Sequence, residues 1–234
     1  MREESSKPEL RSEAFSELRK QSHEQIERET AERVKANPKP SEEEINAGAF
    51  PEMLEPQVRD AIFEMRKKGY ATESSGFGGK TGEVQSMDGY FEIDAKTEQA
   101  LRDIGVEVLR DQGFGPKYSF IRFSPEEPSL EKMKTKWDAV ARLLPDLDRQ
   151  AEPSISGHAE EFLTKYAPER ADVLKRITEL REQHDKEQEQ SSAQRAIDTE
   201  EARATRIARE QEMQEAAQAK IDAIRESVGL KPKG

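Results

Sequence analysis

The sequence predicts an α+β fold, in which a small α-β-β-α-β-β-α domain is flanked at both ends by long polar α-helices. Two observations lead to this prediction. Nearly all strand-like sequence and most glycines fall in one central stretch, whereas the sequence on either side is charged and has helical spacing. Hydrophobic residues make up only 33% of the chain and charged residues 37%, so one core cannot extend through all 234 residues. We therefore divide the chain into zones 1–40, 41–148 and 149–234.

The first zone is expected to form one charged helix and a linker. A narrow apolar stripe runs along the helix, formed by Leu10, Ala14 and Leu18. The segment ANPKPSEEE then ends the helix, because each proline disfavours helical backbone at the residue before it. Ser41 is placed to cap a short following helix, and Glu44 stands at the capping-box position.

The second zone alternates helices and strands. The spacing of its apolar residues predicts helices at about 58–68, 97–105 and 129–144. Strand patterns occur at 70–77, 89–93, 106–111 and 117–123. Elements in this order predict a four-stranded, mainly antiparallel sheet that is covered by helices on one face.

The third zone is helical again, and from about residue 184 it is rich in Glu, Gln, Ala and Arg. Near its end, apolar residues recur at steps of four, three and four, which is typical of a coiled-coil seam: Ala217, Ile221, Ile224 and Val228. This seam lasts about two heptads, which is shorter than the three or four that indicate a coiled coil on their own.

Charge and composition exclude several classes of function. The net charge of −11 opposes binding to nucleic acids and to anionic membrane surfaces. The absence of cysteine excludes disulfides, thiolate metal sites and cysteine nucleophiles. The amino terminus has no apolar segment typical of a secretory signal, and no apolar run approaches the ~20 residues that span a bilayer. We therefore expect a cytoplasmic protein without a membrane segment.

The segment SSGFGGKTG, residues 74–82, ends in the Gly-Lys-Thr of a phosphate-binding P-loop. The P-loop motif requires glycine where this chain has Ser74, and it must lead into a helix, whereas a strand is expected here. We therefore interpret the segment as a glycine-rich hairpin loop. Its N–H groups beside a lysine leave open a weak anion-binding site, formed by Ser75, Gly76, Gly78, Gly79, Lys80 and Thr81.

Catalytic and metal-binding patterns are missing from the sequence. No G-x-S-x-G elbow is present, and the three histidines, His23, His158 and His184, lie outside the predicted α+β domain. No grouped His, Asp and Glu residues have the spacing of a metal site. We therefore predict no catalytic residue, no metal and no cofactor.

The fourth strand carries three aromatic residues, Tyr118, Phe120 and Phe123. Strand alternation places Tyr118 and Phe120 on one face of the sheet and Phe123 on the other, and an exposed aromatic there would mark a partner surface. Stacking of single-stranded nucleic-acid bases is an alternative role. An excess of acidic over basic residues in the domain opposes it, 19 against 14 between positions 51 and 148.

These patterns favour a non-catalytic cytoplasmic interaction or scaffolding protein. Its helical segments would bind a protein partner or a second copy of the chain, through the seam that contains Ile221, Ile224 and Val228. The alternative is a domain or enzyme that binds a small anion or nucleotide at loop 74–82. A third possibility is single-stranded nucleic-acid binding on the sheet face.

Overall fold

The structure is a computed structural model that describes residues 8–36, 39–48, 50–79, 82–110, 115 and 117–227. The chain forms two compact units, Met1–Lys186 and Glu187–Gly234. Among the described residues, no helix combines the length and the apolar character needed to cross a membrane.

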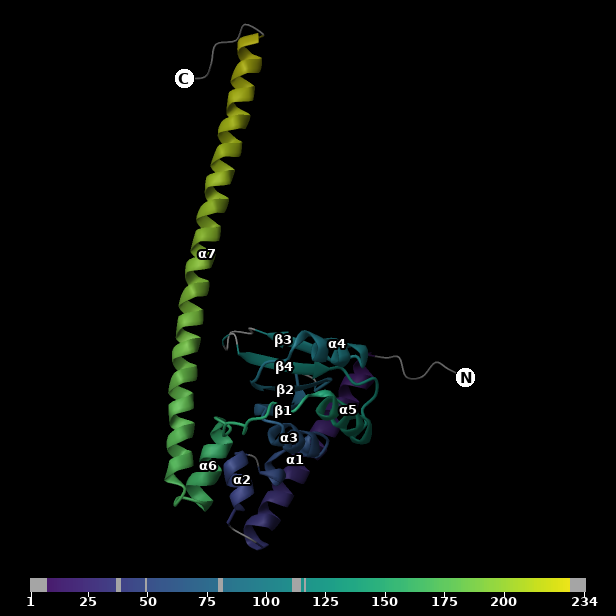
Figure 1. The fold of residues 1–234 in the computed structure, drawn as a ribbon. Coiled ribbons are helices and arrows are strands. Elements are labelled where there is room, and N and C mark those ends of the chain that lie inside the picture. The colour runs from purple at the N-terminus through teal and green to yellow at the C-terminus, as the bar shows by residue number, and fades with distance from the viewer. Residues whose placement is uncertain are drawn as a thin grey trace, which may run out of the picture. The chain divides into compact units, whose positions relative to one another are not determined.

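Helices precede, interrupt and follow a sheet of four strands, which confirms the predicted α+β class with long terminal helices (Figure 1). The elements are α1 (Pro8–Ala36), α2 (Glu42–Ala47), the 3₁₀ helix η1 (Pro51–Met53), α3 (Arg59–Lys67), β1 (Ala71–Gly78), β2 (Val84–Tyr90), α4 (Ala95–Asp103), β3 (Glu107–Arg110), β4 (Tyr118–Phe123), α5 (Leu130–Leu143), α6 (Gly157–Tyr166) and α7 (Ala171–Ser227). The last helix begins in the first unit and continues into the second.

Every pair of neighbouring strands is antiparallel, and the order across the sheet is β1-β2-β4-β3. Gly78 lies opposite Val84, so β2 begins five residues before the strand predicted at 89. The register shifts between Thr72 and Ser74, where a bulge lets Glu73 leave the alternation of the strand. The turn between the two strands is therefore shorter than the predicted glycine-rich loop.

Side-chain caps begin several helices. Ser41 and Glu44 form the predicted capping box at α2, because the serine side chain accepts from the Glu44 N–H and the glutamate accepts from the Ser41 N–H. Asp94 caps α4 and Ser129 caps α5 by accepting backbone N–H bonds in the first turn. The caps of α2 and α5 thus fall at Ser41 and Ser129, where the sequence predicts that these helices begin.

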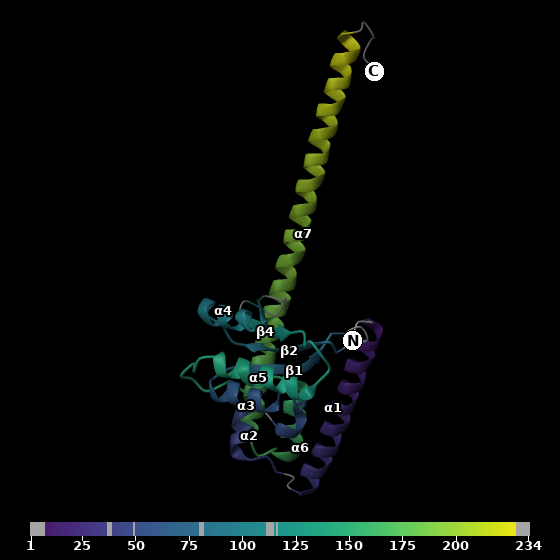
Figure 2. The ribbon, with the colours of Figure 1, turned by 90° about the vertical axis from the view of Figure 1, so that its right-hand side faces the viewer.

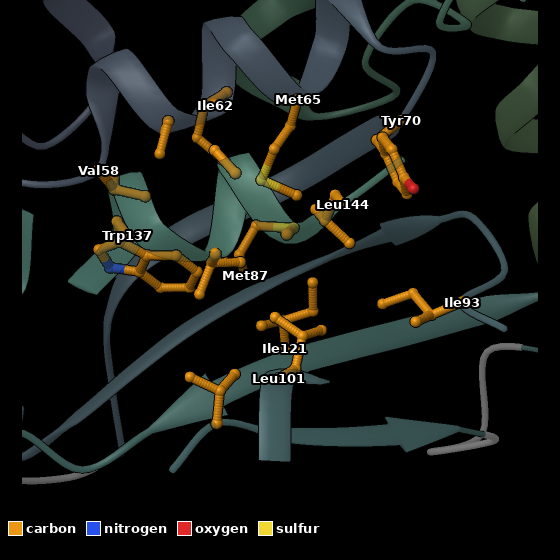
Figure 3. Packing of buried hydrophobic residues seen from close by; sticks show 14 of the residues in the cluster. Val58, Ile62, Met65, Tyr70, Met87, Ile93, Leu101, Ile121, Trp137 and Leu144 are labelled. Atoms are coloured by element: carbon orange, nitrogen blue, oxygen red, sulfur yellow. The ribbon is translucent and has the colours of Figure 1, made fainter. Parts of the chain in front are cut away.

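The main core lies between the sheet and the helices α3 and α5, which cover one of its faces (Figure 3). Apolar residues that alternate along β2 and β4 point into this core, as do the apolar faces of the helices. Its largest fully buried members are Trp137, Tyr70, Phe91, Ile62, Met65, Met87, Leu101, Ile121 and Leu144.

Two smaller clusters attach the other helices of this unit. Apolar residues of α2, α6 and the first turns of α7 form one cluster, in which the rings of Phe50 and Phe162 stack with centroids 3.9 Å apart. The other joins α1 to the domain through Phe15, Phe77 and Met133. Figure 2 shows α1 along one side of this unit. The compact unit thus includes α1, α6 and the beginning of α7, and it crosses the compositional boundaries at 40 and 148.

The second unit contains the remainder of α7. Every side chain from 192 to 217 is exposed, including the apolar residues Ile197, Ile207 and Met213. The side chains of Ile221 and Ile224, and the whole of Val228, lie outside the described residues.

Candidate functional site

The glycine-rich segment is mostly strand. Ser75, Gly76 and Gly78 belong to β1, where they lie opposite Met87, Ser86 and Val84 of β2. Gly79 occupies the turn with a φ of 73°, which suits glycine. Lys80 and Thr81 lie outside the described residues. The structure therefore places three of the six predicted anion-binding residues in a paired strand.

A carboxylate occupies the space beside Gly76. Glu55 Oε2 accepts a hydrogen bond of 2.9 Å from the Phe77 N–H. A Cβ atom on Gly76, which has a φ of 117°, would overlap this carboxylate. The glycine thus admits an acidic side chain of the same chain, whose oxygen already accepts the N–H group that an anionic ligand would need.

A buried chain of polar side chains extends from Glu55 into the core. Gln57 Nε2 donates to Glu55 Oε2 at 2.6 Å and lies 3.2 Å from Gln85 Oε1, which also accepts from Trp137 Nε1 at 3.2 Å. Burial raises the pKa of Glu55, and the bonds from Phe77 and Gln57 oppose that rise. This network connects the β1–β2 hairpin with α5 and with the segment between η1 and α3, because Glu55 and Gln57 come from that segment.

A second polar cluster lies on the sheet face opposite the core. Asp88 of β2 accepts bonds from the Ser74 N–H at 3.1 Å, from Ser74 Oγ at 2.7 Å and from the Tyr118 hydroxyl at 2.8 Å. Burial and the neighbouring carboxylate raise the pKa of Tyr118, so its hydroxyl stays protonated at neutral pH. Asp88 therefore joins three strands, and its three accepted bonds disfavour a role as a general base.

His184 of α7 lies against this cluster. Its ring meets Tyr90 edge to face at a centroid distance of 5.6 Å and stacks on Tyr118 at 6.3 Å. Tyr118 is buried and Phe120 is half-buried. His184 therefore lies near the α+β sheet even though it follows the domain by more than thirty residues, a proximity that the sequence did not indicate.

The three aromatics of β4 do not share a surface. Phe123 is only 4% exposed and packs on Trp137 with ring centroids 5.0 Å apart, inside the main core. Tyr118 and Phe120 point to the other face, beside Asp88. Strand alternation predicted that the residues divide in this way, but not which group faces the helices. Phe123 therefore cannot form part of a partner surface with the other two.

A third polar site attaches the segment after α5 to the outer edge of β1. Glu73, at the bulge, accepts from the Ile155 N–H at 2.7 Å and from Ser154 Oγ at 3.3 Å. Burial raises the pKa of Glu73 to about 8, although nearby Arg66 favours the charged form. The buried guanidinium of Arg66 donates to the carbonyl oxygens of Thr72 and Glu152. These contacts cover part of a sheet edge.

These three polar sites join segments of the first unit that are distant in sequence. Within the described part of the chain, no three His, Cys, Asp or Glu side chains group as metal ligands. A hollow of about 280 Å³ lies between segment 150–153 and the start of α7. Glu152 holds Arg176 at this hollow with two bonds, of 3.1 and 3.0 Å.

Comparison with protein-family models, with curated proteins and with solved structures finds no match to this chain. The middle of α7 carries apolar residues outside the predicted seam. Its apolar residues Ile197, Ala204 and Ile207 are separated by seven and three positions, which is heptad spacing.

Proposed function

We propose that the protein is a non-catalytic, cytoplasmic interaction protein, and that the second unit binds a partner through α7. The partner is another protein or a second copy of the chain. One observation carries the proposal: Ile197, Ile207 and Met213 are 50%, 47% and 60% exposed on a helix whose side chains are all exposed from 192 to 217.

The physical support is the free energy that these side chains gain on burial. An aliphatic side chain that leaves water contributes about 1.5–3 kcal/mol. Ile197 and Ile207 lie on one stripe with Ala204, so a partner helix could cover them together. Recognition of apolar residues at this spacing by a helix or groove is a recurring mode of protein binding. The polar flanks of the stripe would remain in water.

The test is the pair of substitutions Ile197→Glu and Ile207→Glu in the full-length chain. Each change places a charge in the proposed contact, so we expect affinity for captured partners, or for self-association, to fall by at least ~10-fold per residue. Thr199→Glu with Thr205→Glu is the matched control, because it adds the same charge beside the stripe. Light scattering and quantitative pull-down measure the result.

Unchanged mass and unchanged capture with the isoleucine variant would overturn the proposal. An equal loss with the threonine variant would also overturn it, because the effect would then follow charge and not the stripe. The anion-site alternative gains no support from the described residues, since Glu55 already accepts the Phe77 N–H.

A further inference from the structure

Helix α1 lies outside the two larger cores of its unit. The main cluster and the cluster of α2, α6 and α7 are formed by residues from 45 onward, without a side chain from α1. Only the small cluster of Phe15, Phe77 and Met133 includes this helix. The domain can therefore keep most of its buried apolar contacts when α1 leaves.

Polar contacts attach α1 to the rest of the unit at several points along the helix. Arg33 forms ion pairs with Glu44 at 2.6 Å and with Glu52 at 2.7 Å, and both glutamates are buried. Nearer the middle of the helix, Arg59 of α3 bonds Glu29 at 2.6 Å.

His23 Nε2 lies 3.4 Å from Glu55 Oε1, the carboxylate that also accepts the Phe77 N–H. Arg11 donates to the Pro125 carbonyl at 2.6 Å, and Thr30 donates to the Glu52 carbonyl at 3.3 Å. We call the surface formed by Glu44, Glu52, Glu55, Phe77 and Met133 the α1 groove. Its charges and its apolar site match the sequence of α1, so the helix that fits it best is α1 itself.

The connection between α1 and α2 is short and contains two prolines. Five residues, 37–41, separate the two helices, and they read Asn-Pro-Lys-Pro-Ser. Each proline disfavours helical backbone at the residue before it and favours an extended one. If extended, five residues reach roughly 17 Å. A short hinge favours the exchange of an element between copies when closing back within one chain strains it.

We propose that α1 exchanges between two copies of the chain, so that each copy places its α1 in the α1 groove of the other. The exchanged pair reproduces every contact between α1 and its groove. The free energies of the exchanged pair and of two separate copies then differ only through the hinge conformation and through the translational entropy that association costs. Exchange consequently increases with protein concentration and with the preference of the hinge for an extended backbone. This contact does not depend on the proposed binding through α7.

The experiment uses the absence of natural cysteines. One full-length variant carries Glu29→Cys on α1 and the other carries Arg59→Cys on α3, at the ends of the ion pair described above. The two are mixed over a range of concentrations up to the millimolar range and treated with a short bismaleimide cross-linker. We expect a covalent heterodimer of twice the 26.6 kDa chain mass, with a yield that increases with concentration.

Three controls define the result. The double variant with both cysteines in one chain must cross-link internally at low concentration, which shows that the linker reaches. Leu10→Cys, at an exposed site of the same helix, should give at least tenfold less heterodimer with Arg59→Cys. The yield should remain when Ile197→Glu and Ile207→Glu are added, because those changes affect α7 alone.

Absence of heterodimer at the highest concentration, with complete internal cross-linking in the double variant, would overturn the exchange. A yield that disappears with the α7 substitutions would overturn it as well, since association would then depend on α7. Replacing Pro38 and Pro40 by alanine should lower the yield severalfold, because a more flexible hinge closes more easily within one chain. An unchanged or higher yield would contradict the role of the hinge.

Discussion

The two long polar helices of this protein, α1 and the part of α7 beyond Lys186, have similar compositions and different surroundings. α1 buries Phe15 and Ser22 completely against the domain. In α7, by contrast, every side chain from 192 to 217 is exposed. Both segments have narrow apolar stripes. The amount of apolar sequence therefore does not decide whether the side chains of such a helix are buried.

The groups that the helix meets in the domain decide whether its side chains are buried. In α1, one aromatic side chain meets an apolar site formed by the β1–β2 hairpin and α5, and the basic residue Arg33 meets two buried carboxylates. A buried aromatic contributes several kcal/mol, and breaking a buried ion pair leaves an uncompensated charge. A few contacts of this kind outweigh the polar character of the rest of the helix. Four predictions test this comparison.

The largest effect is expected from Phe15→Ala, which removes the apolar anchor of α1. The lost burial and the resulting cavity should cost about 3 kcal/mol of α1 docking. Hydrogen exchange measures it as faster exchange of the α1 amides, with little change in β2 and β4. Leu10→Ala is the control, because Leu10 is 56% exposed on the same helix. Equal protection in both variants would contradict the proposed role of Phe15.

A smaller loss is expected from Arg33→Met, which keeps the aliphatic stem and removes the charge. Glu44 and Glu52 then lose their bonds to Arg33 while they remain buried, which should cost about 2 kcal/mol. The change should lower the urea midpoint. Arg28→Met, at an exposed site of α1, should leave the midpoint where it is. A midpoint that is equal in the two variants would show that these ion pairs add nothing.

The α1 interface should also make stability depend on pH, through Glu55. Burial raises its pKa in the folded protein above that of the unfolded chain. Between the unfolded and the folded pKa of Glu55, the folded state binds more protons than the unfolded state. The contribution of Glu55 to the free energy of unfolding is therefore complete below the unfolded pKa and is lost as pH rises through the folded pKa. Burial raises the pKa of Glu52 in the same direction. Glu55→Gln should therefore reduce the fall in unfolding free energy between pH 5 and 8.

Urea titrations at several pH values measure this dependence. Glu13→Gln, at an exposed site of α1, is the matched control and should keep the parent pH profile. A Glu55→Gln protein with the parent profile would assign the dependence to other groups, and a parent protein that becomes more stable from pH 5 to 8 would contradict the predicted sign.

The smallest effect is expected from Ile197→Ala in α7. The Ile197 side chain is exposed and belongs to none of the clusters of buried residues described above, so the change should alter the unfolding free energy of the first unit by less than about 0.5 kcal/mol. Thermal unfolding of a dilute sample measures it. A loss comparable to that of Phe15→Ala would show that this part of α7 packs on the domain, and it would remove the contrast between the two helices.

Local sequence signals predicted most of the elements. The pattern of KYSFIRF predicted β4, and Ser41 with Glu44 predicted the start of α2. Such signals act within one turn of helix or between neighbouring strand residues, so the sequence states them directly. The segment 74–78 was harder to interpret, because its glycines are typical of loops and only the contact with Glu55 explains Gly76.

The sequence was sufficient to establish the fold class, because periodicity and caps are local properties of the chain. It was not sufficient to assign Phe123 to the core and Tyr118 to the other face, because alternation relates the two residues without saying where the helices pack. It also did not indicate that Phe15, Arg33 and His23 find partners in the domain. Those contacts join residues distant in sequence, and their free energy depends on burial, which exists only when the chain is folded.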